Sequence, residues 1–257
     1  MTELSIPNPF FSAPVYHLHE TGSTMEDAAA LAAEGGNSGF VIAADFQTAG
    51  RGRIAARRWD SPRGRNLLFT LALKAGDIPF GPAALSLRCG LGLSLLLEKR
   101  WGLEPRIKWP NDLLLNDGKI AGILCQGRGD WFFIGIGLNL ITPEITPDLR
   151  RPAASILRAT GREESPLTVL SPLLSELKTA LAVQGWQKQI NRRLYGAGSM
   201  VTVYPGAAET RDSFRVRVLG LAVDGGLMLE DREGRRFPLV SGELAFDDSQ
   251  AAESESD

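Results

Sequence analysis

A glycine- and arginine-rich segment, residues 44–66, has the residue types best suited to binding a ligand. It contains six arginines and three glycines, and Asp60 is the only acidic residue between Gln47 and Asn66. Glycine lets a ligand approach the backbone closely, and arginine supplies a fixed fork of donors that matches carboxylate and phosphate groups. We therefore predict that this segment is a loop that wraps an anion.

Three further motifs follow this segment in order. They are Lys-Trp-Pro-Asn-Asp at 108–112, Lys-Ile-Ala-Gly-Ile-Leu at 119–124 and Gly-Ile-Gly-Leu-Asn at 135–139. Together with Gly-Arg-Gly-Arg at 50–53, they closely resemble the motifs of the biotin protein ligases, which attach biotin to a lysine of a carrier protein. Each motif is weak evidence alone, but four in this order argue against coincidence.

The resemblance implies a two-step reaction without a nucleophilic side chain. Biotin and ATP give biotinyl-5′-adenylate and pyrophosphate, and a carrier lysine then attacks the mixed anhydride while AMP leaves. The residue types agree with such a reaction, because the sequence shows no sign of an activated nucleophile. His17 and His19 are the only histidines, and no Gly-x-Ser-x-Gly motif occurs. Lysines and arginines are the residues left to neutralise the negative charge that develops in the transition state.

The resemblance assigns the basic loop and one lysine to the reacting groups. Gly50, Arg51, Gly52 and Arg53 match the loop that closes over biotin and the adenylate, with the guanidinium groups facing carboxylate and phosphate. Lys119 matches the lysine that bridges the biotin carboxylate and the α-phosphate, and we expect it to be the essential cation. The alternatives are a solvated basic loop and a solvent-facing hairpin lysine.

Polar residues around the first expected helix match contacts to the biotin ureido group. Ser23 and Thr24 match the start of a Ser-Thr-Asn element, and Gln47 matches a second ureido contact. Met25 stands where the family commonly has Asn, which removes one polar contact. Helix N-capping is the alternative role for Ser23 and Thr24.

The Lys-Trp-Pro-Asn-Asp motif matches the positions that bind nucleotide phosphates and orient the carrier lysine. These positions are Lys108, Asn111 and Asp112. We expect Asp112 to orient or deprotonate the ε-amine of the carrier lysine. The alternative for Asp112 is an Asx-type turn after Pro110.

The glycine-rich motifs and a following asparagine complete the expected site. Asn139 resembles the residue near the ATP phosphates and magnesium, while Gly122 and Gly137 give the ligand room. The implied Mg²⁺ would be held by phosphate oxygens and water, so no protein residue is assigned as a metal ligand. Trp59 and Trp109 are interpreted as packing residues.

The elements around these motifs predict an α+β fold with a mainly antiparallel sheet. Consecutive turns such as Asn116-Asp117-Gly118 indicate hairpins, which argue against a doubly wound parallel sheet. The expected helices span 24–33, 82–101 and 166–194, and the expected strands span 40–46, 67–73, 106–109, 113–115, 119–126 and 131–140, with a first strand near Tyr16.

The chain changes character after residue 195. Short strand-like segments separated by Pro-Gly, Asp-Gly-Gly and Glu-Gly turns predict a small β-barrel. They span 200–204, 214–221, 227–230, 235–240 and 243–246. The family resemblance implies an SH3-like barrel here. The expected domains are therefore a catalytic domain at 1–195, the barrel at 196–247 and an acidic disordered tail at 248–257.

Composition narrows the class of protein. Apolar residues make up 44% and charged residues 23% of the chain, as in soluble globular proteins, and the net charge of −2 does not suggest a general nucleic-acid binder. The apolar stretch 83–97 is too short to span a bilayer, and residues 1–10 do not form a signal peptide. We expect a cytoplasmic protein whose two cysteines, Cys89 and Cys125, are buried free thiols.

Two other functions would use parts of the same sequence. A lipoate ligase or octanoyl transferase would share the catalytic fold, but the Gly-Arg-Gly-Arg and Lys-Trp-Pro-Asn-Asp motifs look like the biotin branch. A DNA-binding regulator would need a helix-turn-helix module, and only about fifteen residues precede the first expected strand. The expected partner is a biotin carboxyl carrier protein or domain, with no DNA and no membrane, and a homodimer is compatible with the sequence.

Overall fold

An eight-stranded sheet forms the centre of the computed structural model, which describes residues 1–53, 58–141, 153–204 and 213–246. The strand order is β1-β2-β3-β4-β8-β7-β6-β5, and every neighbouring pair is antiparallel except β2 and β3. The mainly antiparallel α+β fold expected from the sequence is therefore confirmed. The strands are β1 (Thr2–Leu4), β2 (Val15–Leu18), β3 (Val41–Ala44), β4 (Leu67–Lys74), β5 (Arg106–Lys108), β6 (Asp112–Leu115), β7 (Gly118–Arg128) and β8 (Trp131–Leu138).

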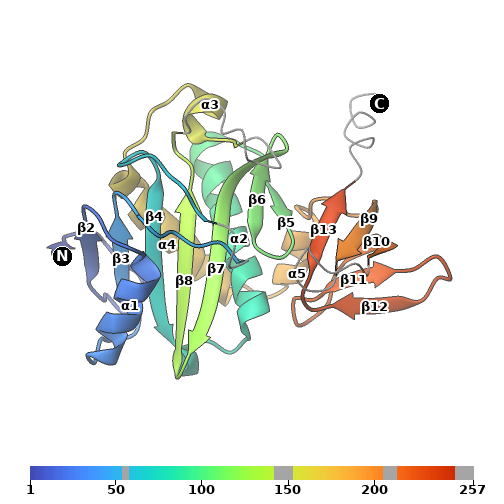
Figure 1. Cartoon of the computed structure of the whole chain (residues 1–257), viewed down its shortest axis with the longest axis horizontal. Coiled ribbons are helices and arrows are strands. Elements are labelled where there is room, and N and C mark those ends of the chain that lie inside the picture. The colour runs from blue at the N-terminus through green and yellow to red at the C-terminus, as the bar shows by residue number, and fades with distance from the viewer. Residues whose placement is uncertain (54–57, 142–152, 205–212, 247–257) are drawn as a thin grey trace.

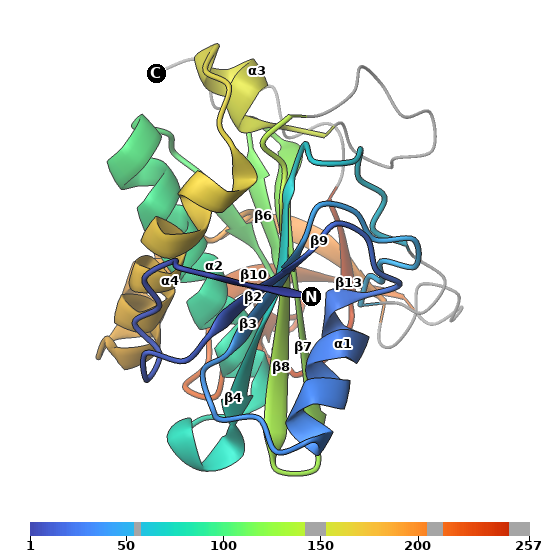
Figure 2. The same cartoon turned by 90° about the vertical axis from the view of Figure 1, so that its left-hand side faces the viewer.

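Helices cover both faces of this sheet. The helices α2 (Pro82–Trp101) and α4 (Pro166–Ala182) pack on one face, and α1 (Thr24–Ala33) packs on β3, β4 and β8 from the other (Figure 2). Helix α2 has Pro82 at its start and ends at Gly102, which adopts a left-handed φ of 66°. These two residues explain why the sequence predicted the bounds of α2 correctly. Among the described residues, every helix is too short or too polar to cross a membrane.

The expected single helix over 166–194 is wrong. The chain forms α4, a break around Gly185 with a φ of 66°, and then α5 (Trp186–Asn191). The guanidinium of Arg88 on α2 donates hydrogen bonds to the carbonyls of Ala180, Leu181 and Val183 at 3.2, 2.9 and 3.1 Å. Because these carbonyls lie at the end of α4, a partner from another helix satisfies the groups that helix termination leaves unpaired.

Some short elements were not expected from the sequence. These are β1, the short helix α3 (Ile156–Thr160) and the 3-10 turn η1 (Ala75–Asp77). Each spans only three to five residues, which is too short for a clear periodicity. Both cysteines are free thiols, but only Cys89 is fully buried, while Cys125 is partly exposed.

A second, five-stranded sheet follows at the C-terminal end of the described chain (Figure 1). It is entirely antiparallel, with the order β12-β11-β10-β9-β13, so β12 and β13 are its edges in the described pairing. A closed barrel at this place stays a prediction. The strands are β9 (Met200–Tyr204), β10 (Phe214–Leu221), β11 (Leu227–Glu230), β12 (Arg236–Leu239) and β13 (Glu243–Phe246).

Side chains from the central sheet hold the second sheet in contact. The buried indole N–H of Trp109 donates to the carbonyl of Gly225 at 3.1 Å, in agreement with a packing role for this tryptophan. The ammonium of Lys108 lies 5.6 Å from the ring centroid of Phe246. The expected boundary at residues 195–196 falls between α5 and β9, and the expected acidic tail, 248–257, lies outside the described residues.

The close packing of α2 against α4 gives a stability prediction. A Cβ added at Gly92 would lie 2.9 Å from the Cα of Leu177, whereas one at Gly90 would meet only side-chain atoms at 3.6 Å or more. We expect Gly92→Ala to lower the free energy of unfolding by about 1 to 2 kcal/mol, because the clash outweighs the gain in helix propensity. Gly90→Ala in the same helix is the matched control.

Denaturant titration of both variants measures the difference. Gly90→Ala should unfold at the wild-type midpoint or above it. Equal midpoints for the two variants would contradict the close helix contact.

Candidate functional site

Two glycines lie next to each other on the face of the central sheet that carries α1, at a place that α1 does not cover. Gly122 on β7 and Gly137 on β8 lie directly opposite each other, with Asp112 on β6 beside the first and Leu68 on β4 beside the second. Residues opposite each other in a sheet point to the same face. The face therefore carries no side chain over the width of two strands, and we call this strip the glycine floor.

The indole of Trp59 lies on the glycine floor. A Cβ on Gly137 would lie 2.4 Å from Cε2 of this ring, and a Cβ on Gly122 would lie 2.7 Å from its Cζ3. The indole Nε1 is buried and has no hydrogen-bond partner among the described residues. Buried indole N–H groups usually find a partner, so this donor is available to a bound molecule.

An ion pair stands at the β6 side of the glycine floor. The Nζ of Lys119 lies 2.7 Å from Oδ1 of Asp112, and the two side chains are 36% and 24% exposed. Oδ1 makes no hydrogen bond of acceptable angle among the described residues, so the contact is chiefly electrostatic. The Lys119 ammonium also lies 5.3 Å from the ring centroid of Trp59, within range of a cation–π interaction. Asp112 thus contacts a cation instead of closing an Asx-type turn.

A polar cluster stands at the β4 side. Both the backbone N–H and the hydroxyl of Thr24 donate to Oε1 of Gln47, at 2.9 and 3.1 Å. The Thr24 hydroxyl also lies 2.8 Å from that of Thr70, which is two residues along β4 from Leu68. Ser23 caps α1, since its hydroxyl accepts a hydrogen bond from the N–H of Met25 at 3.3 Å. The structure therefore brings Thr24 and Gln47 together and gives Ser23 the capping role.

Two buried asparagines brace the backbone under Lys119. The side-chain amide of Asn139 donates to the carbonyl of Lys119 at 3.1 Å, and its oxygen accepts from Asn66 at 3.3 Å. The oxygen of Asn66 accepts from the N–H groups of Leu140 and Ile141 at 2.9 and 3.2 Å. Sequence reasoning missed Asn66. The signal was a single polar residue directly before the wholly apolar start of β4.

The two arginines of the Gly-Arg-Gly-Arg motif bind protein groups away from the glycine floor. Arg51 donates to Oε1 of Glu26 at 3.1 Å, and Arg53 donates to the carbonyl of Gly242 at 2.9 Å. Arg128 binds the same Glu26 at 2.9 Å through two nitrogens. The Arg128 hydrogen bond lowers the pKa of Glu26 below its usual value against the effect of burial, so the carboxylate is ionised at neutral pH.

The other predicted residues are spread around the loop and β6. Gly50 is needed for close approach, because a Cβ there would lie 2.5 Å from the carbonyl oxygen of Trp59. Gly52 follows Arg51 just before residues 54–57, which lie outside the description. The Asn111 side chain donates to the carbonyl of Ile123 at 3.1 Å and so fastens the start of β6 to β7. Lys108 lies beside the second sheet, as described above.

Comparisons with known proteins identify the family. A model of the biotin/lipoate A/B protein ligase family matches residues 21–139. The biotin–(acetyl-CoA-carboxylase) ligase of Paracoccus denitrificans is 33% identical over 250 residues, which cover 89% of this chain and 99% of that protein. The chain belongs to the biotin protein ligase family.

Other biotin protein ligases match to different extents. A solved structure, the Aquifex aeolicus enzyme in complex with biotin and ATP, is 26% identical with a TM-score of 0.78, covering 90% of this chain and 97% of that one. The bifunctional ligase/repressor BirA of Escherichia coli is 34% identical over 149 residues. That match covers 56% of this chain but only 46% of BirA, so the chain spans about half the length of that relative. The family expected from the four motifs is confirmed.

The asparagine pair gives a second stability prediction. In Asn66→Ala the buried N–H of Leu140 loses its acceptor, and Asn139 loses one partner. We expect the free energy of unfolding to fall by about 2 kcal/mol, because a buried donor is left unpaired. Asn37→Ala, at an exposed asparagine, should change it by less than about 0.5 kcal/mol.

Urea denaturation of both variants provides the measurement. An Asn66→Ala protein as stable as Asn37→Ala would show that the asparagine pair does not brace this part of the sheet.

Proposed function

We propose that the chain is an ATP-dependent ligase that activates biotin as biotinyl-5′-adenylate and transfers it to a lysine of a carrier protein. The observation that carries the proposal is the glycine floor with a cation at one side and a polar cluster at the other. A carboxylic acid with a polar ring head fits such a site lengthwise. The biotin ureido group would meet Thr24 and Gln47, and the carboxylate would reach Lys119. The apolar ring and chain would lie on Gly122 and Gly137 in the space that the Trp59 indole fills in this structure, so Trp59 would move aside when biotin binds.

The first step needs charge neutralisation and alignment. A biotin carboxylate oxygen attacks the α-phosphorus of ATP and pyrophosphate leaves, so two anions must be brought into contact. The Lys119 ammonium would bridge the carboxylate and the α-phosphate and neutralise both. Its ion pair with Asp112 fixes the direction of the ammonium at the end of the glycine floor.

The second step needs a free amine. The ε-amine of the carrier lysine attacks the carbonyl carbon of the mixed anhydride, the bond to AMP breaks, and the amine loses a proton. Once Lys119 follows the AMP phosphate, Asp112 is the carboxylate beside the reacting carbonyl and can orient the amine and accept the proton. A general base must lie close to the proton that it accepts. The 2.7 Å contact between Asp112 and Lys119 supports this role, because Lys119 is the proposed partner of the reacting carboxylate.

The arginines would reach the phosphates by exchanging partners. Arg51 is 58% exposed in its ion pair with Glu26, and Glu26 keeps Arg128 when Arg51 leaves. Such an exposed pair is worth only about 0 to 1 kcal/mol, so phosphate can compete for the guanidinium. Gly50, Gly52 and Arg53 complete this loop.

Nucleotide binding completes the proposed site. Lys108, Asn111 and Asn139 would lie along the nucleotide. Mg²⁺ would be held by phosphate oxygens and water, since Asp112, the carboxylate beside the glycine floor, is already paired with Lys119.

Several finer features belong to the same proposal. The carrier would be the biotin carboxyl carrier protein or domain of a carboxylase, which the name of the Paracoccus denitrificans relative supports. Residues 1–195 would form the catalytic domain, and residues 196–247 an SH3-like barrel. The protein would act in the cytoplasm, with a homodimer as a compatible state, and DNA binding is not part of the proposal.

Formation of the acyl-adenylate tests this function. Purified protein is incubated with Mg-ATP and labelled biotin, lipoate or octanoate in parallel, and the adenylates are separated. We expect an adenylate from biotin that disappears when a carrier domain is added. Lys119→Ala should slow its formation by at least about 100-fold, because the bridging charge is lost, while Lys188→Ala, at an exposed lysine, should not.

Two outcomes would contradict the proposal. An adenylate from lipoate or octanoate alone would move the protein to the lipoyl branch. No adenylate from any of the three acids would reject the ligase function.

A further inference from the structure

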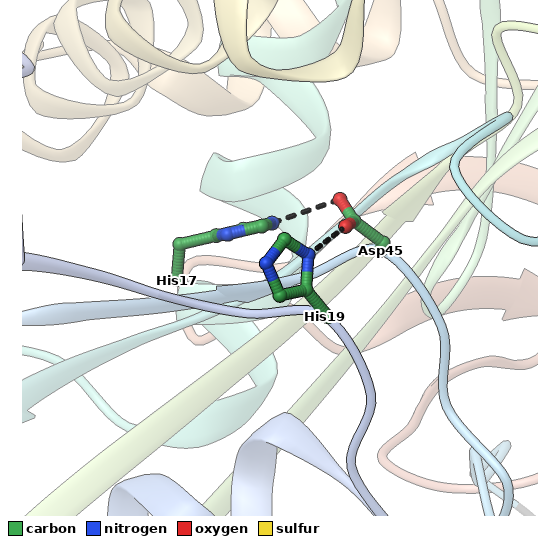
Figure 3. Close-up of side chains that lie close together, drawn as sticks. All are labelled: His17, His19 and Asp45. Atoms are coloured by element: carbon green, nitrogen blue, oxygen red, sulfur yellow. Dashed lines mark hydrogen bonds and ion pairs between the residues drawn. The ribbon is translucent and has the colours of Figure 1, made fainter. Parts of the chain in front are cut away.

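Two histidines and an aspartate meet at the end of β2, away from the glycine floor. Nε2 of His17 lies 2.8 Å from Oδ1 of Asp45, and Nδ1 of His19 lies 3.0 Å from Oδ2 of the same residue (Figure 3). The two imidazole rings stand edge to face with their centroids 5.2 Å apart. The cluster therefore combines two imidazoles with a carboxylate.

The parallel pairing of β2 with β3 creates this cluster. His17 is in register with Ala43, and the N–H of Asp45 donates to the carbonyl of Leu18 at 3.0 Å. Parallel strands end at the same edge of a sheet, and residues two apart on a strand point to the same side. Hence His17 and His19 lie on one side, next to the first residue after β3.

The distances suit a metal ion with imidazole and carboxylate ligands. One ligand atom from each of the three residues lies within 4.8 Å of the others. Zinc bonds of about 2.0 to 2.2 Å put neighbouring ligand atoms about 3.3 Å apart in a tetrahedral site. The 2.8 Å separation of His17 Nε2 from Asp45 Oδ1 would open by about half an ångström to admit the ion. His19, whose Nδ1 contacts the other oxygen of Asp45, would turn its ring toward the ion.

The side chains are placed to allow that adjustment. His17 is 11% exposed and Asp45 31% exposed, so they form a fixed base, whereas His19 is 91% exposed and its ring can turn. The nearby guanidinium of Arg63 is paired with Glu20 and stacks on the ring of Phe46, so its charge is largely balanced. The exposed side of the cluster leaves room for water as a fourth ligand.

We propose that His17, His19 and Asp45 bind a divalent transition metal of the zinc class, with water as the fourth ligand. Two imidazoles and one carboxylate suit zinc, cobalt or nickel better than magnesium, which prefers oxygen ligands alone. The site is separate from the Mg-ATP of the proposed reaction and does not depend on it.

The metal would fasten two segments that lead to the proposed biotin site. Beyond the cluster, the N–H of Thr21 donates to the carbonyl of Phe46 at 3.1 Å, and Thr21 forms a parallel bridge with Gln47. The N–H of Gly64, near the end of the arginine-rich loop, donates to the carbonyl of Asp45 at 2.8 Å. Because Asp45 joins both segments, a metal there would stabilise the backbone that carries Gln47.

Zinc binding by untagged, chelator-treated protein tests the proposal. Isothermal titration with zinc chloride should show one site per chain that a large excess of magnesium does not displace. His19→Ala and Asp45→Asn should each weaken binding by at least about tenfold, and the control Glu34→Gln, at an exposed glutamate outside the cluster, should bind as the wild type. A hundredfold excess of zinc over its dissociation constant should raise the Tm of the wild type by about 5 °C or more.

Cobalt substitution separates this site from the cysteines. The neighbouring Cys89 thiol and burial raise the pKa of Cys125 well above its usual value, so the Cys125 thiol is a poor ligand at neutral pH. We expect a cobalt spectrum without an intense thiolate-to-metal band. Unchanged zinc affinity in His19→Ala, which alters an exposed side chain, or no zinc binding by the wild type, would overturn the proposal. Adenylate formation with Mg-ATP is measured separately, so its outcome does not affect this test.

Discussion

The pairing of Gly122 with Gly137 across β7 and β8 is the constraint on which the candidate site depends. Any side chain at either position would fill the space in which the Trp59 indole lies. Around Gly122 and Gly137 the two strands carry no side chain on this face and bury little apolar surface there, so this part of the sheet must gain its stability from the other face. The packing of α2 and α4 on that opposite face provides it. The glycine floor can therefore remain open to the arginine-rich loop.

The ends of the glycine floor differ chemically, and each is held by a different part of the fold. On the β6 side, Lys119 is braced from below through its carbonyl by Asn139, and Asn139 contacts Asn66 at the end of the arginine-rich loop. On the β4 side, Thr24 at the start of α1 is bound to Gln47. The loop thus begins near one side of the floor and ends in the asparagine pair that supports the other. The end of this loop and the position of Lys119 are consequently linked through short hydrogen-bonded contacts.

Local signals explain what the sequence predicted well. The bounds of α2 follow from Pro82 and Gly102, and four ordered motifs identified the family. The features that the sequence did not predict depend on contacts between segments that lie far apart along the chain. The end of α4 depends on Arg88 from another helix, and the present partners of Arg51 and Arg53 come from α1 and from the segment before β13. The cluster of His17, His19 and Asp45 requires the parallel pairing of β2 with β3, which residue spacing alone does not indicate.

Biotin affinity of a protein with an altered glycine floor tests the central claim most directly. Isothermal titration would compare the wild type with Gly137→Ala and with Gly127→Ala, where the added Cβ meets only ordinary contacts of 3.4 Å or more on the same sheet. We expect Gly137→Ala to stay folded but to bind biotin at least about tenfold more weakly, and Gly127→Ala to bind as the wild type. Wild-type biotin affinity in a folded Gly137→Ala protein would contradict the proposed position of biotin on the glycine floor.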